Sequence, residues 1–579
     1  MDQAQNAAPR TAAQLLVECM VEQGTQRIFT VPGESFLAVL DALHDTTHDT
    51  THDTSEGAAI ETVTCRQEGG AAFMACADGA MSVAEGTGRP GVAFVTRGPG
   101  ATNASIGVHV AYQDSQPMVL FVGDVARRMR DREGFQEVDF AAFFGPICKW
   151  AARIDDPARI PEYIARAYSV AISGRPGPVV IALPEDMLCD MVPASLRPRP
   201  MVVRPAQAAC PDAMQAMLAL LGDAASPIAI IGGAGWNAKA REHFQAFAER
   251  IGLPVATAFR RQDAIAPTSP VYAGNLGYGP NPKLVERVKQ ADLILAVGAR
   301  LGEATTDGYA FPRPDHPDQV LIHVHPDADE LSRVYQTELE LCCSVDEFAE
   351  AAALWEDDAI IPFDAGGEAH REWLDWATFV PSGNPPALDM AACVTAMRDA
   401  LPADTIIANG AGNFAGWWHR YWRYDGLPTQ LAPTAGAMGY GVPAAIAAAL
   451  RYPHKTVVAV AGDGDFMMNG QELATAAQHG ANMMVLVVDN GAYGTIRMHQ
   501  EREYPGRVSA TRLSNPDFAA LGSAYGAWSA TVETTTEFME ALARAKDRNG
   551  LRLIHMVIHV EQLAASGATI SGLRAKATS

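Results

Sequence analysis

A strand–helix–strand pattern late in the chain constrains its fold more than any other feature. An apolar run ends in Gly462-Asp463-Gly464, a segment with helical periodicity follows, and a second apolar run ends in Asp489-Asn490. Two apolar strands joined by a helix at this spacing predict a parallel crossover. Asp463 and Asn490 should therefore lie side by side at the carboxyl ends of neighbouring strands, the edge at which open α/β sheets bind ligands.

The residues at that edge are typical of magnesium and phosphate chemistry. One carboxylate and one amide oxygen are hard ligands, and Mg²⁺ keeps few protein ligands while it takes others from phosphate. Gly464 allows the backbone to approach a phosphate closely, and a helix expected at 471–479 would direct its positive end toward that phosphate. The alternative is a glycine-rich turn followed by an unrelated strand end, which makes the spacing a coincidence.

Composition narrows the class of protein. The chain has 579 residues, of which 48% are apolar, enough for about three to four domains that each bury a core. A formal net charge of −23 argues against nucleic acid and against an anionic membrane surface as partners. The nine cysteines form no CxxC pair, the N-terminal residues are polar, and no uncharged apolar run of about 18 residues occurs. We therefore expect a cytoplasmic protein.

The whole sequence predicts an α/β fold in three blocks. Each block alternates apolar strands with amphipathic helices, a pattern typical of parallel sheets covered by helices on both faces. Two Pro-rich stretches, 191–210 and 357–388, are expected linkers, and they divide the chain into domains at 1–190, 205–355 and 385–560. The tail, 566–579, is expected to be loosely structured. The strands expected in the first two blocks are 92–96, 118–122, 179–182, 228–232, 293–298 and 320–324.

One segment is repetitive. The sequence HDTTHDTTHDT, residues 44–54, lies between an expected helix at 36–43 and an expected strand at 60–64. Tracts of His and Asp can bind transition metals. We interpret this one as a surface loop that arose by tandem duplication and has no function of its own, because loops tolerate such insertions.

A second candidate site lies in the first block. Glu68 follows the expected strand at 60–64, and Gly69-Gly70 and a helix of small residues come after it. A carboxylate at a strand end beside glycines and apolar side chains is expected to be partly desolvated, which suits it to proton transfer. The alternative is a glutamate that complements the dipole at a helix N-terminus. Both interpretations stay open from these residues alone.

These motifs resemble those of the thiamine diphosphate (ThDP) enzymes, in which GDG is followed some 25 to 30 residues later by Asn. The segments RQEGGAAFMA, GVAFVTRGPGATNASIG, GFQEVD, GAMGYG and NPDFAALGSAYG resemble the acetolactate synthase-like branch, in order and over nearly the whole chain. The resemblance implies three doubly wound parallel-sheet domains: pyrimidine-binding (1–190), central (205–355) and diphosphate-binding (385–560). It also implies a carboligase or decarboxylase of 2-oxo acids, with the active site between two subunits of a homodimer or homotetramer.

The same resemblance implies the cofactors and their ligands. ThDP and Mg²⁺ are expected, with Asp463, Asn490 and the carbonyl of Ala492 on the metal. Glu68 corresponds to the glutamate that binds N1′ of the aminopyrimidine, and Met438 to the bulky residue under the thiazolium. The other cofactor-binding positions implied by the resemblance are Gly410, Gly412, Asn413, Phe414, Gly436, Gly462, Gly464, Asp465, Tyr493, Gly494 and Thr495.

Three residues are candidates for the substrate side. Gln136, in GFQEVD, and Lys149, in PICKW, match polar positions that line the substrate side in acetolactate synthases. Lys149 is equally well explained as a solvated lysine at a helix end. His109 is a candidate acid or base, and equally well a helical histidine without a catalytic role.

Three other positions depart from a biosynthetic acetolactate synthase. Ala304 stands where that family has an arginine that contacts the substrate, His499 where it has a tryptophan that favours 2-oxobutyrate, and Asp124 where it has a glutamine. The loss of a guanidinium that could pair with a carboxylate is not a conservative change. We therefore expect a substrate pair other than pyruvate and 2-oxobutyrate.

A nucleotide in the central domain is left open. The glycine turn at 230–236 fits FAD, ADP or a CoA-type nucleotide, but the segment at 274–281 lacks the histidine of the family's flavin loop. Within the same class, a benzoylformate decarboxylase-type enzyme or a 2-hydroxyacyl-CoA lyase is the alternative. A NAD-dependent oxidoreductase built on the glycine turn is a further alternative, but no acidic residue about twenty positions further on has an obvious place at a strand end, so that fingerprint is incomplete. A ThDP-binding scaffold without catalysis is disfavoured because Glu68, Asp463 and Asn490 are all retained.

Overall fold

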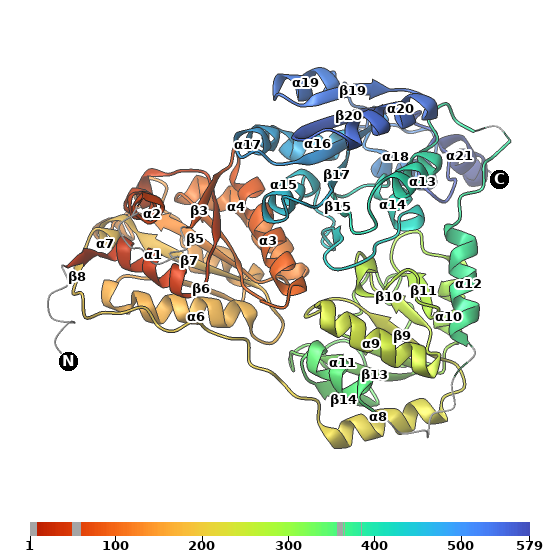
Figure 1. Cartoon of the computed structure of the whole chain (residues 1–579), viewed down its shortest axis with the longest axis horizontal. Coiled ribbons are helices and arrows are strands. Elements are labelled where there is room, and N and C mark those ends of the chain that lie inside the picture. The colour runs from red at the N-terminus through yellow and green to blue at the C-terminus, as the bar shows by residue number, and fades with distance from the viewer. Residues whose placement is uncertain (1–8, 49–59, 356–362, 364, 384, 579) are drawn as a thin grey trace. The chain divides into compact units, whose positions relative to one another are not determined.

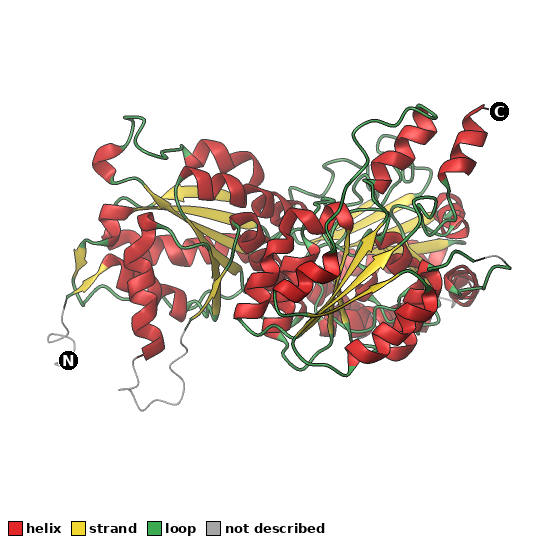
Figure 2. Cartoon of the chain, turned by 90° about the horizontal axis from the view of Figure 1, so that it is seen from above, coloured by secondary structure: helices red, strands yellow, loops and turns green. Residues whose placement is uncertain are grey.

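The computed structural model describes residues 9–48, 60–355, 363, 365–383 and 385–578. The chain folds as two compact units, one formed by residues 1–83 and 87–205 and the other by 84–86 and 206–579. The first unit contains one six-stranded parallel sheet and the second contains two, each flanked by helices (Figure 1, Figure 2). The predicted α/β class with three parallel sheets is confirmed.

The sheet of the first unit has the strand order β3-β2-β4-β5-β7-β6, with every pair parallel. A short antiparallel pair, β1 with β8, joins the two ends of this unit. Helix α6 shows why helices cover the sheet: its buried residues Ile160, Ile164, Ala167 and Ala171 recur at helical spacing and form one apolar face. The strands are β1 (Arg10–Thr11), β2 (Arg27–Thr30), β3 (Glu61–Thr64), β4 (Gly91–Val95), β5 (Met118–Asp124), β6 (Trp150–Arg153), β7 (Pro178–Pro184) and β8 (Met191–Val192). The helices are α1 (Ala12–Glu22), α2 (Leu37–His48), α3 (Glu68–Ala84), α4 (Gly98–Gln113), α5 (Phe140–Phe144), α6 (Ile160–Ile172) and α7 (Glu185–Leu188).

The first sheet of the second unit, the middle sheet, has the order β11-β10-β9-β12-β13-β14. Its strands are β9 (Pro227–Ile231), β10 (Val255–Thr257), β11 (Tyr272–Asn275), β12 (Leu293–Val297), β13 (Val320–His325) and β14 (Leu339–Cys342). The helices along this part of the chain are α8 (Pro211–Asp223), α9 (Ala238–Ile251), α10 (Pro282–Gln290), α11 (Val345–Ala353) and α12 (Ala365–Ala377).

The last sheet has the order β16-β15-β17-β18-β20-β19, again with every pair parallel. Its strands are β15 (Ile406–Asn409), β16 (Gln430–Leu431), β17 (Val457–Gly462), β18 (Met483–Asp489), β19 (Trp528–Val532) and β20 (Leu551–Val557). The helices are α13 (Met390–Ala400), α14 (Ala415–Tyr421), α15 (Gly441–Arg451), α16 (Asp463–Asn469), α17 (Leu473–Gln478), α18 (Gly494–Glu503), α19 (Phe518–Ala524), α20 (Thr535–Lys546) and α21 (Ile570–Thr578).

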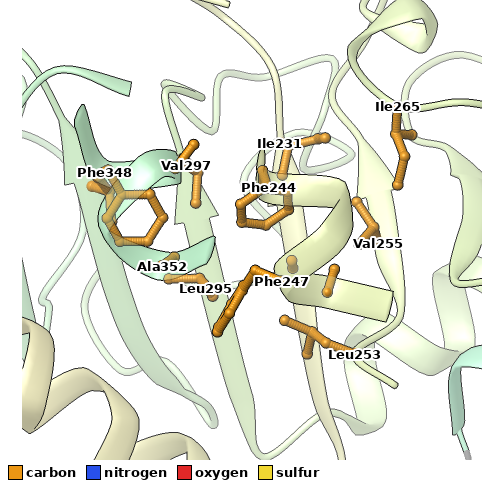
Figure 3. Close-up of a cluster of buried hydrophobic side chains, with 14 of the residues drawn as sticks. Ile231, Phe244, Phe247, Leu253, Val255, Ile265, Leu295, Val297, Phe348 and Ala352 are labelled. Carbon is orange, nitrogen blue, oxygen red and sulfur yellow. The ribbon is translucent and has the colours of Figure 1, made fainter. Parts of the chain in front are cut away.

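Strand residues of the middle sheet alternate between two apolar cores. Leu295 and Val297 of β12 face a cluster that includes Phe244 and Phe247 of α9 and Phe348 of α11 (Figure 3). The intervening strand residues, such as Ile294 and Ala296, belong to a second cluster. Because side chains of a strand alternate between faces, a continuous apolar run requires cover on both faces, as parallel sheets have.

The six strands expected in the first two blocks are confirmed to within two residues at each end. The helix expected at 471–479 begins earlier: α16 starts at Asp463 itself, a 3-10 turn follows at Gly470–Glu472, and α17 completes the crossover. Gly470, the first residue of that turn, packs closely on the Phe466 ring, from which a Cβ would be only 2.6 Å away.

Two other expectations were wrong. The tail is not loosely structured, since α21 forms there and its Arg574 guanidinium pairs with Glu501 at 2.8 Å. An ion pair to a residue 73 positions away leaves no apolar pattern in the tail itself. The repeat does not begin as a loop either, because α2 continues to His48. The rest of the repeat lies outside the described residues.

The linker expected at 357–388 contains the 13-residue helix α12. Its Trp373 ring packs on Tyr272 of β11, with centroids 4.6 Å apart, so the helix contacts the middle sheet. The domain boundaries remain a prediction. Among the helices of the described residues, none is both long enough and apolar enough to cross a membrane.

Candidate cofactor and metal site

The carboxyl edge of the last sheet gathers three loops. β15, β17 and β18 are neighbours in the sheet, and the loops that follow them contain residues 410–414, 463–465 and 490–495. β17 and β18 pair in parallel with Gly462 opposite Val488, so Asp463 and Asn490 come at the carboxyl ends of adjacent strands. The sequence spacing predicted this juxtaposition.

The expected metal ligands are oriented by local hydrogen bonds. Asp463 is buried, and its two carboxylate oxygens accept from the Gly464 amide at 2.9 Å and from the Asn515 side chain at 2.8 Å. The Asn490 side-chain oxygen accepts from the Ala492 amide at 3.0 Å, which forms a turn over Gly491. A carboxylate, an amide oxygen and the nearby Ala492 carbonyl form a set of hard oxygen donors that fits Mg²⁺.

Asp463 belongs to a partly buried hydrogen-bond network that the sequence did not predict. The Asn515 amide donates to Asp463 and also, at 2.7 Å, to Asp489, whose other oxygen lies 3.0 Å from Nε2 of His555. Burial raises the pKa of Asp463. Burial also opposes ionisation of Asp489, but the hydrogen bonds from His555, the Gly491 amide and Asn515 outweigh it and lower the pKa of that carboxyl. The NPDF segment signalled Asn515 only as part of the resemblance.

Asp465 connects the cofactor loops. Its Oδ1 accepts from the Ala411 amide at 3.1 Å and from the Gly439 amide at 2.8 Å, so one carboxylate fixes two separate loops. Burial raises its pKa to about 7, in spite of these bonds and of the positive charge of Arg260. Gly410 must lack a side chain, because a Cβ there would come within 2.0 Å of the Asp465 carboxylate.

The other cofactor candidates lie on these same loops. The Asn413 amide donates to Thr495 Oγ1 at 3.0 Å, which joins the loop after β15 to the loop after β18. The Phe414 ring lies against Gly412 and Gly462, and the Tyr493 ring against Gly464, where a Cβ would be 2.4 Å away. A Cβ at Gly494 would come within 2.7 Å of the Asn490 side chain. The glycines of this edge therefore allow side chains of one loop to pack on the backbone of another.

Gly436 and Met438 lie on a further loop at this edge. The Gly436 amide donates to the Pro433 carbonyl at 3.0 Å, closing a turn that Gly436 completes with φ +68°. Gly436 is exposed and Met438 is half-buried. Gly439, which follows Met438, has φ +81°. Its amide donates the hydrogen bond that Asp465 accepts.

These residues fit ThDP and Mg²⁺. Besides the oxygen donors, the edge contains two buried oxygens without a hydrogen-bond partner among the described residues, Asn409 Oδ1 and Asp465 Oδ2. Buried polar atoms are normally paired, so unpaired ones at a ligand-binding edge indicate a polar ligand. Bound ThDP would supply a carbon nucleophile and an electron sink, and the metal would neutralise its diphosphate.

Glu68 lies in the first unit, as the first residue of α3 and four residues after β3. It is half-buried, and its Oε2 accepts from the Asn103 side chain at 2.9 Å. The glutamate is thus both close to a strand end and at a helix N-terminus, which joins the two interpretations made from the sequence. The orienting amide of Asn103, on α4, was not predicted.

The three substrate-side candidates are not brought together. Gln136 lies near the Glu68 end of the sheet, because its carbonyl accepts from the amide of Gly98, which follows β4. Lys149 lies at the opposite edge: it precedes β6, and its Nζ donates to the Ser173 carbonyl at the end of α6, at 2.6 Å. That contact agrees with a lysine at a helix end. His109 is exposed on α4.

The three departing residues occupy different surroundings. Ala304 is half-buried beside Thr305, and His499 is exposed on α18. Asp124 ends β5 and is buried, with its carboxylate 2.9 Å from Nε of Arg153. Burial raises the pKa of Asp124. Because the guanidinium faces this carboxylate, Asp124 does not present an unpaired charge.

The glycine turn of the middle sheet gives no support for a nucleotide. A Cβ at Gly233 would meet the Gly298 carbonyl at 2.1 Å, and one at Gly232 would meet the side chains of Ala258 and Arg261. Trp236 is fully buried and donates its indole N–H to the Gly232 carbonyl at 3.0 Å. These glycines allow neighbouring segments of the chain to pack closely against the turn. Their presence is therefore explained without bound FAD or NAD.

Comparison with known proteins gives the same picture for the whole chain. Three family models of thiamine pyrophosphate enzymes match: the N-terminal TPP binding domain at residues 10–143, the central domain at 214–352 and the C-terminal TPP binding domain at 410–556. The acetolactate synthase large subunit of Corynebacterium glutamicum is 30% identical over 94% of this chain and 86% of its own length. That of Parasynechococcus marenigrum is 31% identical over 90% and 83%, and the isozyme 3 large subunit of Escherichia coli is 28% identical over 95% of each chain.

Each of the three matched models falls on a different sheet, and the two TPP-binding domains contain Glu68 and the loops around Asp463. The relatives align with 90% or more of this chain, so the similarity includes each of the three blocks. The chain therefore belongs to the thiamine diphosphate-dependent enzymes, in the branch of the acetolactate synthase large subunits.

Proposed function

We propose that this protein removes CO₂ from a 2-oxo acid and joins the remaining acyl carbon to a second carbonyl compound, with ThDP and Mg²⁺ as cofactors. The observation that carries the proposal is the arrangement of Asp463 and Asn490 at adjacent strand ends, on loops that Asp465 and Thr495 connect. A rigid set of oxygen donors on strand ends is what a diphosphate-bound Mg²⁺ requires.

Each residue has a proposed task. Asp463, Asn490 and the Ala492 carbonyl bind Mg²⁺, and the loop residues from Gly410 to Phe414 and from Tyr493 to Thr495 line the diphosphate. Gly436 offers its backbone to the pyrimidine, and Met438 supports the thiazolium from below. Glu68, oriented by Asn103, shares a proton with N1′ of the pyrimidine. Gln136 is a candidate for the substrate side.

The substrates are proposed to differ from pyruvate and 2-oxobutyrate. Without a guanidinium at Ala304, the substrate carboxylate loses a bidentate partner, and without an indole at His499 the preference for 2-oxobutyrate loses its basis. The relatives are named acetolactate synthases, so pyruvate is the first donor to test. A benzoylformate decarboxylase-type or 2-hydroxyacyl-CoA lyase reaction is the second candidate, favoured by the alanine at position 304.

The assembly and location are also proposals. We expect a homodimer at least, in which the pyrimidine-binding domain of one chain faces the diphosphate-binding domain of another, and we expect the protein in the cytoplasm. The acidic net charge and the absence of an 18-residue apolar run in the sequence support a small-molecule enzyme of this compartment.

Product analysis tests the proposed reaction. The purified chain is incubated with ThDP, Mg²⁺ and one substrate at a time (pyruvate, 2-oxobutyrate, benzoylformate or a 2-hydroxyacyl-CoA), then with pairs of the 2-oxo acids, and products are identified by NMR. A ligated 2-hydroxy-3-oxo acid that forms only with both cofactors present supports the carboligase. Aldehyde as the only product, or cleavage of a 2-hydroxyacyl-CoA with no turnover of 2-oxo acids, favours the second candidate.

A further inference from the structure

A segment of the middle sheet reaches into the loops that carry the cofactor candidates. Arg260-Arg261-Gln262-Asp263 follows β10, and three of its side chains bond to the last third of the chain. The backbone N–H of Gln262 donates to the side-chain oxygen of Gln430 at 2.7 Å. The side-chain nitrogen of Gln430 donates in turn to the side-chain oxygen of Gln262 at 3.2 Å. Asp263 Oδ2 accepts from the amides of Thr429 and Gln430, at 3.3 and 3.2 Å.

All these groups are buried, and buried polar groups that are paired fix the relative position of the segments that bear them. Gln262 adds a bond to the His419 carbonyl on α14, at 2.9 Å. The segment 260–263 is thus hydrogen-bonded to α14, to β16 and to Pro433, which follows β16. Beyond β16 the chain continues directly into the loop that contains Gly436 and Met438.

Arg260 makes the contact nearest to that loop. It is 5% exposed, and its Nη1 donates to the Pro433 carbonyl at 2.5 Å. The same carbonyl accepts from the Gly436 amide at 3.0 Å. The guanidinium therefore binds the first residue of the turn that presents Gly436, and a charged donor makes this a strong bond.

The backbone of Arg260 is held in an unfavourable conformation. Its φ is +61°, a left-handed region that residues other than glycine rarely adopt. Neighbouring contacts keep it there: the Phe259 amide donates to Thr305 Oγ1 at 3.2 Å, and the Phe259 ring lies on Gly277, where a Cβ would be 2.3 Å away. Such strain persists only where the surroundings determine the conformation, and it is concentrated at functional sites.

The loop is fixed at its other end as well. Gly439 donates to Asp465, and its carbonyl accepts from the Asn469 side chain at 3.0 Å. Between Pro433 and Gly439, Gly436 is exposed and Met438 is half-buried. The bonds at Pro433 and at Gly439 hold the two ends of the segment that contains both residues.

We propose that Arg260 is a positioning residue for the cofactor, which sets the loop from Pro433 to Gly439 so that Gly436 and Met438 meet the pyrimidine and the thiazolium. The inference rests on the roles proposed above for those two residues. It adds a residue from the middle sheet, outside both cofactor-binding domains, to the machinery that shapes the bound cofactor.

The test compares Arg260→Met and Arg260→Lys in the full chain with Arg250→Met. Arg250 is the matched control, because its guanidinium also donates to backbone carbonyls, those of Ala352 and Ala353, but within the middle sheet's own layer. Three quantities are measured: the Tm without cofactor, the Kd for ThDP with Mg²⁺, and the rate of C2–H/D exchange of ThDP at saturation.

We expect Arg260→Met to lower the Tm more than Arg250→Met, because the Arg260 guanidinium is buried and that of Arg250 is exposed. Only Arg260→Met should slow the exchange at saturating ThDP, by roughly 10- to 100-fold, since small misplacements of catalytic groups have effects of this size. Arg260→Lys keeps the charge and one donor and should recover part of the rate. If Arg260→Met does not fold, the exchange rate of Arg260→Lys tests the inference in its place.

Wild-type exchange rates in the folded Arg260 variants would overturn the inference. Such a result leaves the proposed function intact, provided that the wild-type protein binds ThDP and exchanges C2–H faster than free ThDP. If the wild-type protein binds no ThDP, the proposed function itself fails.

Discussion

Asp463 and Asp489 accept hydrogen bonds from the same nitrogen, the Asn515 side-chain amide, at 2.8 and 2.7 Å. Asp463 is buried and Asp489 is half-buried, and two carboxylates that face one donor repel each other, so a shared amide stabilises the pair without adding charge. The imidazole of His555 lies on the far side of Asp489, so the charge of that residue is stabilised from two directions. In the proposed site, the Asp463 carboxylate is then the one that binds Mg²⁺.

Removing the shared donor should therefore weaken the metal site. In Asn515→Ala we expect Mg²⁺ to bind about 10- to 100-fold more weakly in the presence of ThDP, the range typical of residues that orient a metal ligand. Asn482→Ala is the control: its side chain accepts from the Gly550 amide, at the amino end of β18 and away from the site. Titration of Mg²⁺ followed by tryptophan fluorescence measures both. Equal affinities in the two variants would mean that Asn515 does not orient Asp463.

The raised pKa of Asp465 leads us to expect that the free energy of unfolding depends on pH. Its pKa of about 7 in the folded protein lies above the ordinary value of 3.8, so between these values the unfolded chain binds fewer protons than the folded one. The free energy of unfolding then falls as the pH rises from about 4 to about 7, by roughly 1 to 4 kcal/mol. Asp465→Asn cannot ionise and should lack this part of the pH dependence.

The measurement is the Tm of wild type and Asp465→Asn, without cofactor, at pH 5 and pH 8. We expect the Tm difference to shift in favour of the variant at the higher pH. Parallel changes in both proteins would show that Asp465 does not titrate in this range.

Glu68 is expected to act on a proton. In Glu68→Gln the contact with Asn103 can persist through an amide oxygen, but the residue can no longer take part in proton transfer. ThDP should still bind, and its C2–H/D exchange should slow by about 100-fold or more. Glu61→Gln, which changes an exposed glutamate of the same sheet paired with Arg27, is the control. Unchanged exchange in Glu68→Gln would remove this residue from the mechanism.

The departures from acetolactate synthases predict a gain of activity. If Ala304 and His499 explain a shifted specificity, the double variant Ala304→Arg/His499→Trp should form more acetolactate from pyruvate, because a guanidinium restores a partner for the substrate carboxylate. The comparison is made by kcat/KM against the wild-type protein and each single variant. No gain would place the determinants of specificity elsewhere in the pocket.

The parts of the structure that the sequence predicted are those with local signals. Continuous apolar runs predicted strands such as β12 and β17, and the spacing of Asp463 and Asn490 predicted which strands are neighbours. The roles of Asn515, Asn103 and Arg260 were not predicted, because these residues act through long-range hydrogen bonds, which leave no periodicity in the sequence. For the same reason the sequence does not predict the tail helix, in which Arg574 pairs with Glu501. Lys149 matched a motif, but its place at the amino end of β6 separates it from Glu68.

The proposed function depends most on the metal site at Asp463. Isothermal titration of ThDP into the wild-type chain, with Mg²⁺ and with EDTA, tests it directly, beside Asp463→Ala and the control Asp404→Ala, whose exposed carboxylate pairs with Lys455. We predict binding that requires Mg²⁺ in the wild type and in Asp404→Ala, and no Mg²⁺-dependent binding in Asp463→Ala, since Asn490 alone offers no charge to hold the ion. Full ThDP affinity in Asp463→Ala would contradict the assignment of the site.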